Sequence, residues 1–368
     1  MIAFQALHII VQCSKSDATR RTTKRSYMMS KSDRARTILA SVTAGAATAA
    51  LLAGANYLAA RRAERKHPPK GSFVVVDGVK LHYSDRGTGS PVVLIHGNAV
   101  TGADWNTSGV ADRLLSQHRV IIFDRPGFGY SERPRGRLWT ASRQAELLHQ
   151  AIRQLGVEKP IVVGHSWGAI VALAMAVQHQ AELAGAVLVS GYYHWTLRPD
   201  VVLVTIGALP GIGDLLRYTV SPLLGWLQMP LLKWQMFSPA PVPARFQDEY
   251  STGMALRPSQ IRATSEDGAL MIPGALAMQG SYGDLTLPVV IIAGASDRVV
   301  FKERSEQLAD DIPGSILQVV EGAGHMVHHF EPARIVAAVD RMAMLSEGSL
   351  RLRSPCSQSL GKVDELIE

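Results

Sequence analysis

Short apolar segments alternate with amphipathic or small-residue segments along most of this chain, from Ser72 to about residue 345. The segments expected as strands are residues 73–76, 79–83, 91–95, 120–123, 161–163, 186–189, 289–293 and 316–320. Helical spacing appears at 140–155, at 168–178 and from Pro332 onward. Strands that are apolar on both faces and alternate with helices indicate a parallel sheet covered on both sides. We therefore predict an α/β domain over residues 72–345, with a mostly parallel eight-stranded sheet and helices on both faces.

The interval from His194 to Leu285 interrupts this alternation. It is rich in Pro, apolar and aromatic residues, and helical segments are expected at 201–206, 215–227 and 258–261. We predict a helical cap inserted at residues 194–285. The alternative is a run of ordinary core helices.

The pentapeptide Gly164–Gly168, which reads GHSWG, lies between an expected strand and an expected helix. Gly-x-Ser-x-Gly in this context is typical of a nucleophile elbow, a strained turn that lifts the serine above the sheet edge. The two glycines remove side chains that would collide with neighbouring turns. The sequence therefore predicts Ser166 as the nucleophile, with the backbone N–H of Trp167 free to stabilise an oxyanion.

An acid and a base follow Ser166 in the order that this elbow requires. Asp297 comes after the strand 289–293, and His325 comes after the strand 316–320. We expect His325 to act as the general base and Asp297 to fix its tautomer and stabilise its charged form.

Other residues are weaker candidates for the same roles. Asp267 and Asp284 do not follow a strand end. We expect His165 to pack beneath the elbow, and His328 and His329 to make cap or surface contacts.

Two further loops follow strands and belong to the same expected site. His96-Gly97-Asn98 follows the strand 91–95, so the backbone N–H of Asn98 is the expected second oxyanion donor. A simple turn is the alternative interpretation. The loop 124–129 is rich in glycine, but no Gly-Lys-Ser/Thr follows it, so we interpret it as structural support and not as a phosphate loop.

Residues 37–60 form an uncharged stretch with basic residues on both sides. A helix needs about 20 residues to cross a bilayer, so this stretch is a candidate membrane anchor. One alternative is a signal peptide cleaved at Ala53-Gly54-Ala55, which would leave a secreted protein. A soluble Ala-rich helix and an organelle presequence are the others, and the flanking charges do not decide the orientation of a span.

The flanking segments complete the expected organisation. Residues 1–36 are a basic leader, whose true start is open because Met29 begins a compact version of it. Residues 61–71 are charged and contain two prolines, which predicts a linker. Residues 346–368 are a polar tail that we expect to be partly disordered.

The distribution of charge argues against a nucleic-acid partner. Residues 1–70 hold 13 of the 38 Lys and Arg but 3 of the 31 Asp and Glu, so this end carries +10 and the remaining chain carries −3. The basic residues thus flank the apolar stretch, while the body is mildly acidic. We expect no metal and no cofactor, because the sequence contains neither a metal-ligand constellation nor a nucleotide fingerprint.

Taken together, these motifs resemble the α/β-hydrolase fold superfamily in order and spacing across residues 72–345. The motifs are His96-Gly97-Asn98, the loop 124–129, Gly164–Gly168, the Asp297 segment and Gly322–His325. Similar members include esterases, lipases, C–C bond hydrolases and cofactor-free haloperoxidases. Haloalkane dehalogenases and epoxide hydrolases share the positions of Asn98 and Trp167 but carry Asp as the nucleophile, so Ser166 argues against halide and epoxide substrates.

We therefore expect a membrane-anchored serine hydrolase that cleaves an acyl ester or related carbonyl compound through an acyl-enzyme. The apolar, Trp-bearing cap favours a small hydrophobic carbonyl substrate. Acyl transfer, peroxide chemistry and C–C cleavage remain open on the same residues, as does a ligand receptor without turnover. Neither the substrate nor the oligomeric state can be predicted from this sequence.

Overall fold

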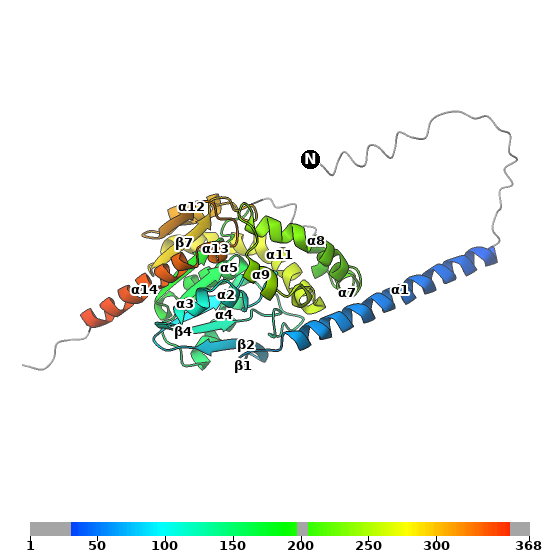
Figure 1. Cartoon of the computed structure of the whole chain (residues 1–368), viewed down its shortest axis with the longest axis horizontal. Coiled ribbons are helices and arrows are strands. Elements are labelled where there is room, and N and C mark those ends of the chain that lie inside the picture. Colours follow the sequence, from blue (N-terminus) through cyan, green and yellow to red (C-terminus); the bar gives the residue numbers. More distant parts are fainter. Residues whose placement is uncertain (1–30, 197–204, 354–368) are drawn as a thin grey trace, which may run out of the picture. The chain divides into compact units, whose positions relative to one another are not determined.

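The computed structural model describes residues 31–196 and 205–353 (Figure 1). The chain divides into two units, residues 1–49 and residues 50–368. The second unit holds an eight-stranded sheet in the order β1-β2-β4-β3-β5-β6-β7-β8. The strands are β1 (Ser72–Val76), β2 (Val79–Arg86), β3 (Ser90–Ile95), β4 (His118–Phe123), β5 (Ile161–His165), β6 (Gly185–Val189), β7 (Val289–Gly294) and β8 (Ile316–Val320). The prediction of a mostly parallel eight-stranded sheet is confirmed, because β2 alone makes antiparallel pairings, with β1 and with β4, and the other neighbouring strands of the described sheet are parallel.

Helices between the strands cover the sheet. They are α2 (Asp104–Thr107), α3 (Val110–Leu114), α4 (Ala141–Gln154), α5 (Trp167–His179), η1 (Gln180–Glu182), α12 (Glu303–Asp311), α13 (Val327–Phe330) and α14 (Pro332–Arg353). At the edge of the sheet formed by β1, the strands β1 and β2 form a hairpin through Asp77-Gly78. Both turn residues have positive φ, as a tight two-residue turn requires. The helix α14 continues past Ser346, where we had expected the tail to begin, and residues 354–368 lie outside the described residues.

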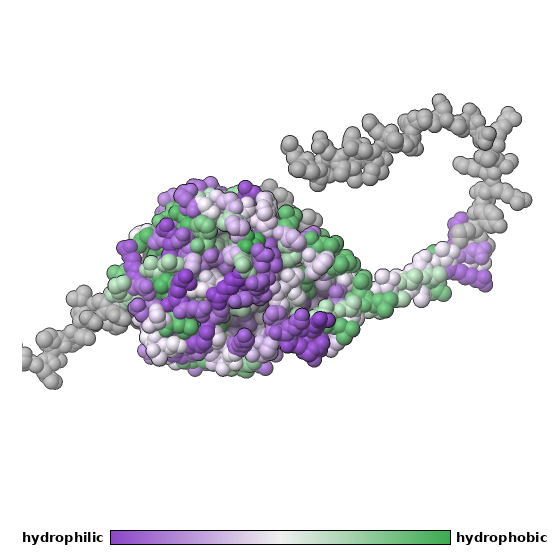
Figure 2. Space-filling view, in the orientation of Figure 1, coloured by the Kyte–Doolittle hydropathy of each residue, from purple (hydrophilic) through white to green (hydrophobic). Residues whose placement is uncertain are grey.

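The insertion between β6 and β7 contains most of the remaining helices. They are η2 (Ile206–Ala208), α7 (Ile212–Tyr218), α8 (Ser221–Phe237), α9 (Ala244–Glu249), α10 (Thr252–Ala255), α11 (Pro258–Met278) and η3 (Gln279–Asp284). Helices α7, α8, α9 and α11 gather on one side of the sheet in Figure 1. Apolar residues lie at the surface over α7 and α8 (Figure 2). The helix expected at 201–206 lies mostly outside the described residues.

The single helix predicted for residues 215–227 is wrong, because the chain breaks it between Tyr218 and Ser221. The physical cause is Pro222, which has no N–H and would clash with the carbonyl of the residue four positions earlier, Tyr218. Proline is tolerated in a first helical turn, and Pro222 accordingly lies at the start of α8.

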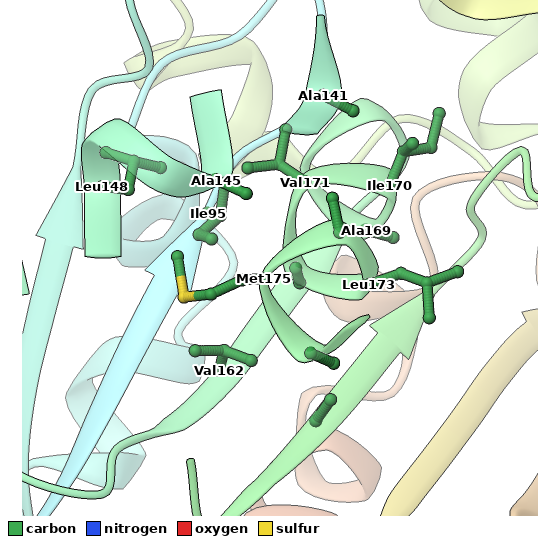
Figure 3. Packing of buried hydrophobic residues seen from close by; sticks show 14 of the residues in the cluster. Ile95, Ala141, Ala145, Leu148, Val162, Ala169, Ile170, Val171, Leu173 and Met175 are labelled. Atoms are coloured by element: carbon green, nitrogen blue, oxygen red, sulfur yellow. The ribbon is translucent and has the colours of Figure 1, made fainter. Parts of the chain in front are cut away.

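Side chains of the strands alternate between two buried layers. On one face, Ile95 of β3 and Val162 of β5 pack with Leu148 of α4 and Met175 of α5 (Figure 3). On the other face, the neighbouring strand residues join Trp105, Leu114 and residues of α14. Both faces are therefore dry, which explains the continuous apolar runs in the parallel strands.

The helix α1 (Lys31–Lys66) is the one helix of the described residues that is long and apolar enough to cross a membrane, judged by length and composition. It includes residues 61–66, which we had expected to be linker. Those residues belong to the second unit and pack within it: Ala63 is buried, and Glu64 pairs with Arg257 at 3.1 Å. An extended stretch begins at His67.

Candidate active site

Ser166 lies in the turn between β5 and α5 with φ 54° and ψ −119°, a strained backbone conformation. The turn is tight enough that a Cβ atom on Gly164 would lie 2.2 Å from the carbonyl oxygen of Gly168. A Cβ atom on Gly168 would lie 2.2 Å from the carbonyl oxygen of Ile95 on the neighbouring strand. Both glycines are thus required by close backbone approach, which is the geometry of a nucleophile elbow.

The structure brings the three side chains expected at the site into one hydrogen-bonded chain, which we call the Ser166 relay (Asp297, His325 and Ser166). Nδ1 of His325 donates to Oδ2 of Asp297 at 2.8 Å, and Nε2 of His325 lies 2.9 Å from Oγ of Ser166. The other oxygen of Asp297 accepts hydrogen bonds from the N–H groups of Val299 and Val300. With Nδ1–H directed at a carboxylate, Nε2 is the unprotonated nitrogen and can accept the serine proton.

The segments that carry the two expected oxyanion donors both adjoin Ser166. Trp167 is the first residue of α5, so its N–H has no acceptor within the helix. Asn98 follows Gly97, and a Cβ atom on Gly97 would lie 3.0 Å from Cβ of Ser166. The loop that carries the Asn98 N–H therefore passes directly against Ser166, and we call residues 96–100 the oxyanion loop.

Sequence reasoning treated the loop 124–129 only as support and missed the role of Arg125. Its guanidinium is wholly buried and donates to the carbonyl oxygens of His96 and Gly97 and, at 2.6 Å, to Oδ1 of Asn98. Asp267 of the cap accepts from the same group at 2.6 Å. Burial lowers the pKa of Arg125 to about 10, although the negative charge of Asp267 opposes this shift. The guanidinium therefore stays positive at neutral pH. Arg125 thus fixes the oxyanion loop and ties it to the cap.

The sequence contains one signal for the role of Arg125: a charged residue there follows directly after a buried strand. Its partner Asp267 could not be inferred, because it lies in the cap helix α11, 142 positions further along the chain.

A second set of histidines lies next to the relay, and we call it the Asp104 cluster (Asp104, His328 and His329). The two oxygens of Asp104 accept hydrogen bonds from Nε2 of His328 at 2.7 Å and Nε2 of His329 at 2.8 Å. Burial alone would raise the pKa of Asp104, but the charges and hydrogen bonds of His329 and His328 hold it well below its usual range. The cluster therefore consists of an anionic carboxylate shared between two rings.

The expected cap or surface contact is correct for His329 and wrong for His328. His329 packs edge-on against Phe237 and Phe246 of the cap. The His328 ring is fully buried against Trp105 and His165, because Asp104 offers it an acceptor inside the protein. Burial lowers the pKa of His328 to about 4, although Asp104 opposes the shift.

His165 packs beneath the elbow, as expected. Its Nε2 donates to the carbonyl oxygen of His325 at 3.1 Å, and its ring lies between the rings of His325 and His328. Burial first, then the neighbouring His328 and His325, lower the pKa of His165 well below its usual value. His165 is therefore a neutral link between the two histidine sets.

Two groups in the described part of the chain bring ligand atoms close enough for a metal ion, within 4.8 Å of one another. They are Asp104 with His165 and His328, and His149 with His179 and Glu182. In the first, a cation would have to displace the histidine protons from both oxygens of Asp104. In the second, His149 and His179 already face Glu182 and Glu146. The carboxylates of both groups therefore already have hydrogen-bond or ion-pair partners within the protein.

A buried apolar cluster lies next to the relay in the chain, at the residue that follows His325. Met326, next to His325, packs with Val100 of the oxyanion loop and with cap residues Met236, Phe237 and Phe246. A separate cavity of about 980 Å³ lies between β2, residues 66–72 and the helices α9 and α10. It reaches Ala99 and Val100, but its lining contains none of the three relay side chains.

Comparisons with known proteins agree with this fold. A family model described as alpha/beta hydrolase fold matches residues 90–332. The 2-hydroxymuconate semialdehyde hydrolase of Pseudomonas putida is 27% identical over 282 residues, covering 74% of this chain and 95% of that protein. Haloalkane dehalogenase 2 of Mycobacterium bovis is 26% identical over 274 residues, covering 71% and 90%. An esterase structure from Exiguobacterium antarcticum superposes with a TM-score of 0.63 at 21% identity, covering 75% of this chain and 100% of that one. Since the family model matches more than half of its residues, the chain belongs to the α/β-hydrolase fold family.

Proposed function

We propose that this protein is a serine hydrolase that cleaves an acyl ester or related carbonyl compound through an acyl-enzyme. The observation that carries the proposal is the unbroken hydrogen-bonded chain from Asp297 through His325 to Ser166. A binding module has no need of a base aimed at a strained serine hydroxyl. This chain therefore favours turnover over a ligand receptor.

The reaction follows from the positions of these groups. Oγ of Ser166 attacks the carbonyl carbon as Nε2 of His325 takes its proton. The carbonyl oxygen becomes an oxyanion, which the N–H groups of Trp167 and Asn98 receive. His325 then gives the proton to the departing alkoxide, leaving the acyl group on Ser166. Water, deprotonated by His325, attacks this ester and restores the free serine.

A hydrophobic acyl or alkoxy group fits the surroundings of the relay best. The nearby apolar cluster of Val100, Phe237 and Met326 would contact such a group and exclude water from it. Removal of apolar surface from water contributes roughly 25 cal/mol per Å², so longer chains gain binding energy until the cluster is filled.

Likeness to a haloalkane dehalogenase does not extend to the chemistry of Ser166. If a serine displaced halide from an alkyl carbon, the product would be an ether, which water does not cleave. A carboxylate nucleophile would instead give an ester that water can hydrolyse. We therefore propose carbonyl chemistry and not halide displacement.

Cleavage of a C–C bond next to a carbonyl is the second candidate. Its support is the likeness to the 2-hydroxymuconate semialdehyde hydrolase over 95% of that protein. The same relay serves, but the leaving group is then a carbon that must receive the proton. Turnover of 2-hydroxymuconate semialdehyde at a rate exceeding that of every ester tested would favour this candidate.

We propose further that α1 anchors the protein in a membrane. The helix is long and apolar enough to span a bilayer, and basic residues flank the span expected at 37–60. Contacts between the end of α1 and other parts of the second unit, such as that of Glu64 with Arg257, support a retained anchor over a discarded signal peptide.

Hydrolysis of p-nitrophenyl esters of graded acyl length by the full chain in mild detergent tests the proposed activity. We expect kcat/KM to rise with acyl length and Ser166→Ala to remove at least about 10³-fold of it. Unchanged turnover in a folded Ser166→Ala protein would falsify the proposal.

A further inference from the structure

The outer face of the cap helices α7 and α8 carries an unusual concentration of exposed apolar side chains (Figure 2). On α7 they are Ile212, Leu215 and Tyr218, and on α8 they are Leu223, Leu224, Trp226, Leu227, Leu231 and Trp234. Each is more than 40% exposed, and Trp226 is 63% exposed. We call this set the cap face. Soluble surfaces rarely gather large apolar side chains in this way, so the cap face indicates an interaction surface.

The cap face is almost free of charge. Asp214, Arg217 and Lys233 are the three charged residues in the sequence from Thr205 to Phe237. The Lys233 ammonium lies over the Tyr250 ring, 4.8 Å from its centroid. The Arg217 side chain is buried and pairs with Asp214, which also accepts from Arg135 at 2.8 Å. An apolar surface whose few charges are paired fits a lipid phase better than a polar partner.

The cap face joins α1 at a specific point. Because Pro222 cannot donate to the carbonyl of Tyr218, that oxygen would have no helical partner at the break between α7 and α8. Nδ2 of Asn56 on α1 donates to this carbonyl at 2.8 Å and to that of Thr219 at 2.7 Å. The one strongly polar side chain near the end of the expected span is thus used to fasten the cap, and it satisfies carbonyls that a bilayer could not.

The position of this junction sets the depth of the cap face. Asn56 precedes Ala60, the last residue of the expected span, by four residues, which is about 6 Å along a helix axis. Helices that lie in a membrane interface insert their apolar faces about 5–10 Å below the headgroups. The junction therefore brings the end of α7 to the depth at which an interfacial helix lies.

Basic residues follow at the expected level of the headgroups. Arg61, Arg62, Arg65 and Lys66 form the last turns of α1, and all four are exposed. Cations here attract anionic lipid headgroups, at about 1 kcal/mol for each residue near the surface.

We propose that the cap face lies in the surface of an anionic phospholipid bilayer, alongside the point at which α1 enters it. The inference rests on the proposed anchor and extends it, because it assigns a second membrane contact to the catalytic unit itself. Continuity with the span, the depth of Asn56 and the basic residues beside it favour a bilayer over a second copy of this chain as the occupant.

This arrangement also suggests how substrate reaches the relay. The end of α8 meets the loop that carries His325: the N–H of Met326 donates to the carbonyl oxygen of Met236 at 3.2 Å, and Gly324 lies against Ser238. The helix α8 therefore runs from the lipid-facing surface to the catalytic histidine. An acyl substrate dissolved in the bilayer would approach along it, which deepens the proposed function to esters presented by a membrane.

The test places a nitroxide at one cap-face position and at a matched position elsewhere. Leu227 is 60% exposed on the cap face, and Phe301 is 61% exposed between β7 and α12, so Leu227→Cys and Phe301→Cys form a matched pair. Both are made in a full chain with Cys13 and Cys356 replaced by Ser, at one copy per nanodisc of phosphatidylcholine and phosphatidylserine. Collision rates with oxygen, which concentrates in lipid, and with a water-soluble nickel chelate then report the environment of each label.

We expect the label at Leu227 to collide at least about fivefold more with oxygen, relative to nickel, than the label at Phe301. Equal, water-like ratios at both positions would overturn the inference. If the Leu227 label is water-exposed at one copy per disc but protected at two, the occupant is a second copy of the chain, which also overturns it.

A second measurement separates this inference from the proposed activity. Leu227→Asp should reduce kcat/KM for a long-chain ester presented in vesicles by about tenfold and leave a short water-soluble ester unaffected, whereas Phe301→Asp should change neither. Loss of both activities in Leu227→Asp, or loss of neither, contradicts the inference. Absence of ester turnover in the parent protein would instead refute the proposed function, while the collision data would still decide the membrane contact.

Discussion

The Ser166 relay and the Asp104 cluster lie side by side, and each contains a buried aspartate that accepts a hydrogen bond from Nε2 or Nδ1 of a histidine. In the relay, the far nitrogen of His325 faces a serine hydroxyl at 2.9 Å. In the cluster, the far nitrogen of His328 has no hydrogen-bond partner in the described part of the chain. This difference indicates that an aspartate–histidine pair can act in catalysis only where the second ring nitrogen of the histidine contacts a reactive group. We expect the relay to carry activity and the cluster to carry stability.

The largest expected effect separates the two sets through their histidines. His325→Ala should lower kcat by about 10⁵-fold, because the serine loses its base. His328→Ala should leave kcat within about tenfold and destabilise the fold. Ester kinetics and detergent-compatible thermal melts of both variants check this. Comparable losses of kcat in the two proteins would break the distinction.

The next largest effect concerns the acid of the relay. Asp297→Asn keeps the shape of the side chain but removes the carboxylate that holds the proton on Nδ1 of His325, so kcat should fall by about 10⁴-fold. KM for a short ester should stay within about threefold, since Asp297 lies behind the histidine. A variant that retained a tenth of the parent kcat would show that Asp297 is not the orienting acid.

In the Asp104 cluster, removal of the carboxylate is expected to lower stability. Asp104→Ala leaves two buried histidine N–H groups without acceptors, at roughly 1–3 kcal/mol each, so the free energy of unfolding should fall by about 4 kcal/mol. Asp104→Asn retains one acceptor oxygen and should cost about half as much. Denaturant unfolding of the two variants measures both values. Equal stability of Asp104→Ala and the parent protein would contradict the assigned role.

Acid should destabilise the protein through the histidines that are buried neutral. Burial lowers the pKa of His328, and likewise that of His96, to about 4 from an ordinary value of 6.5. Between pH 6.5 and 4 the unfolded chain binds protons at these sites and the folded chain does not, so stability falls as the pH falls through this range. Each site contributes up to about 3 kcal/mol to that loss.

A matched variant isolates the share of His328 in this pH dependence. His328→Gln keeps an N–H donor for Asp104 without a titrating group, so its stability should fall less steeply with acid than that of the parent protein. Identical slopes between pH 6.5 and 4 would show that His328 does not titrate in the unfolding reaction.

Much of the fold follows from local patterns in the sequence. The apolar runs at 161–163 and 289–293 predict parallel strands that are buried on both faces. In the structure, apolar clusters cover both faces of the sheet. The relay residues could be selected because each follows a strand end, and parallel strands place those ends at one edge. Ser166, Asp297 and His325 therefore required no knowledge of long-range packing beyond the strand order.

Residues whose roles depend on packing between distant segments could not be predicted in this way. Arg125 and Asp267 meet only because α11 packs against the loop 124–129. Asp104 and His328 meet across 224 positions of sequence, and periodicity contains no signal for that contact. Pro222 indicates a helix break in the sequence, but the apolar spacing on either side of it predicts one continuous helix.

The central claim is that Ser166 is a nucleophile activated by His325, and covalent labelling tests it most directly. The full chain is treated with a fluorophosphonate, and the modified peptide is identified by mass spectrometry, with Ser166→Ala and His325→Ala as controls. We predict one adduct, on Ser166, that is absent from Ser166→Ala and forms at least about 10³-fold more slowly in His325→Ala. A folded parent protein that stays unlabelled, or that is labelled equally fast without His325, would contradict the account.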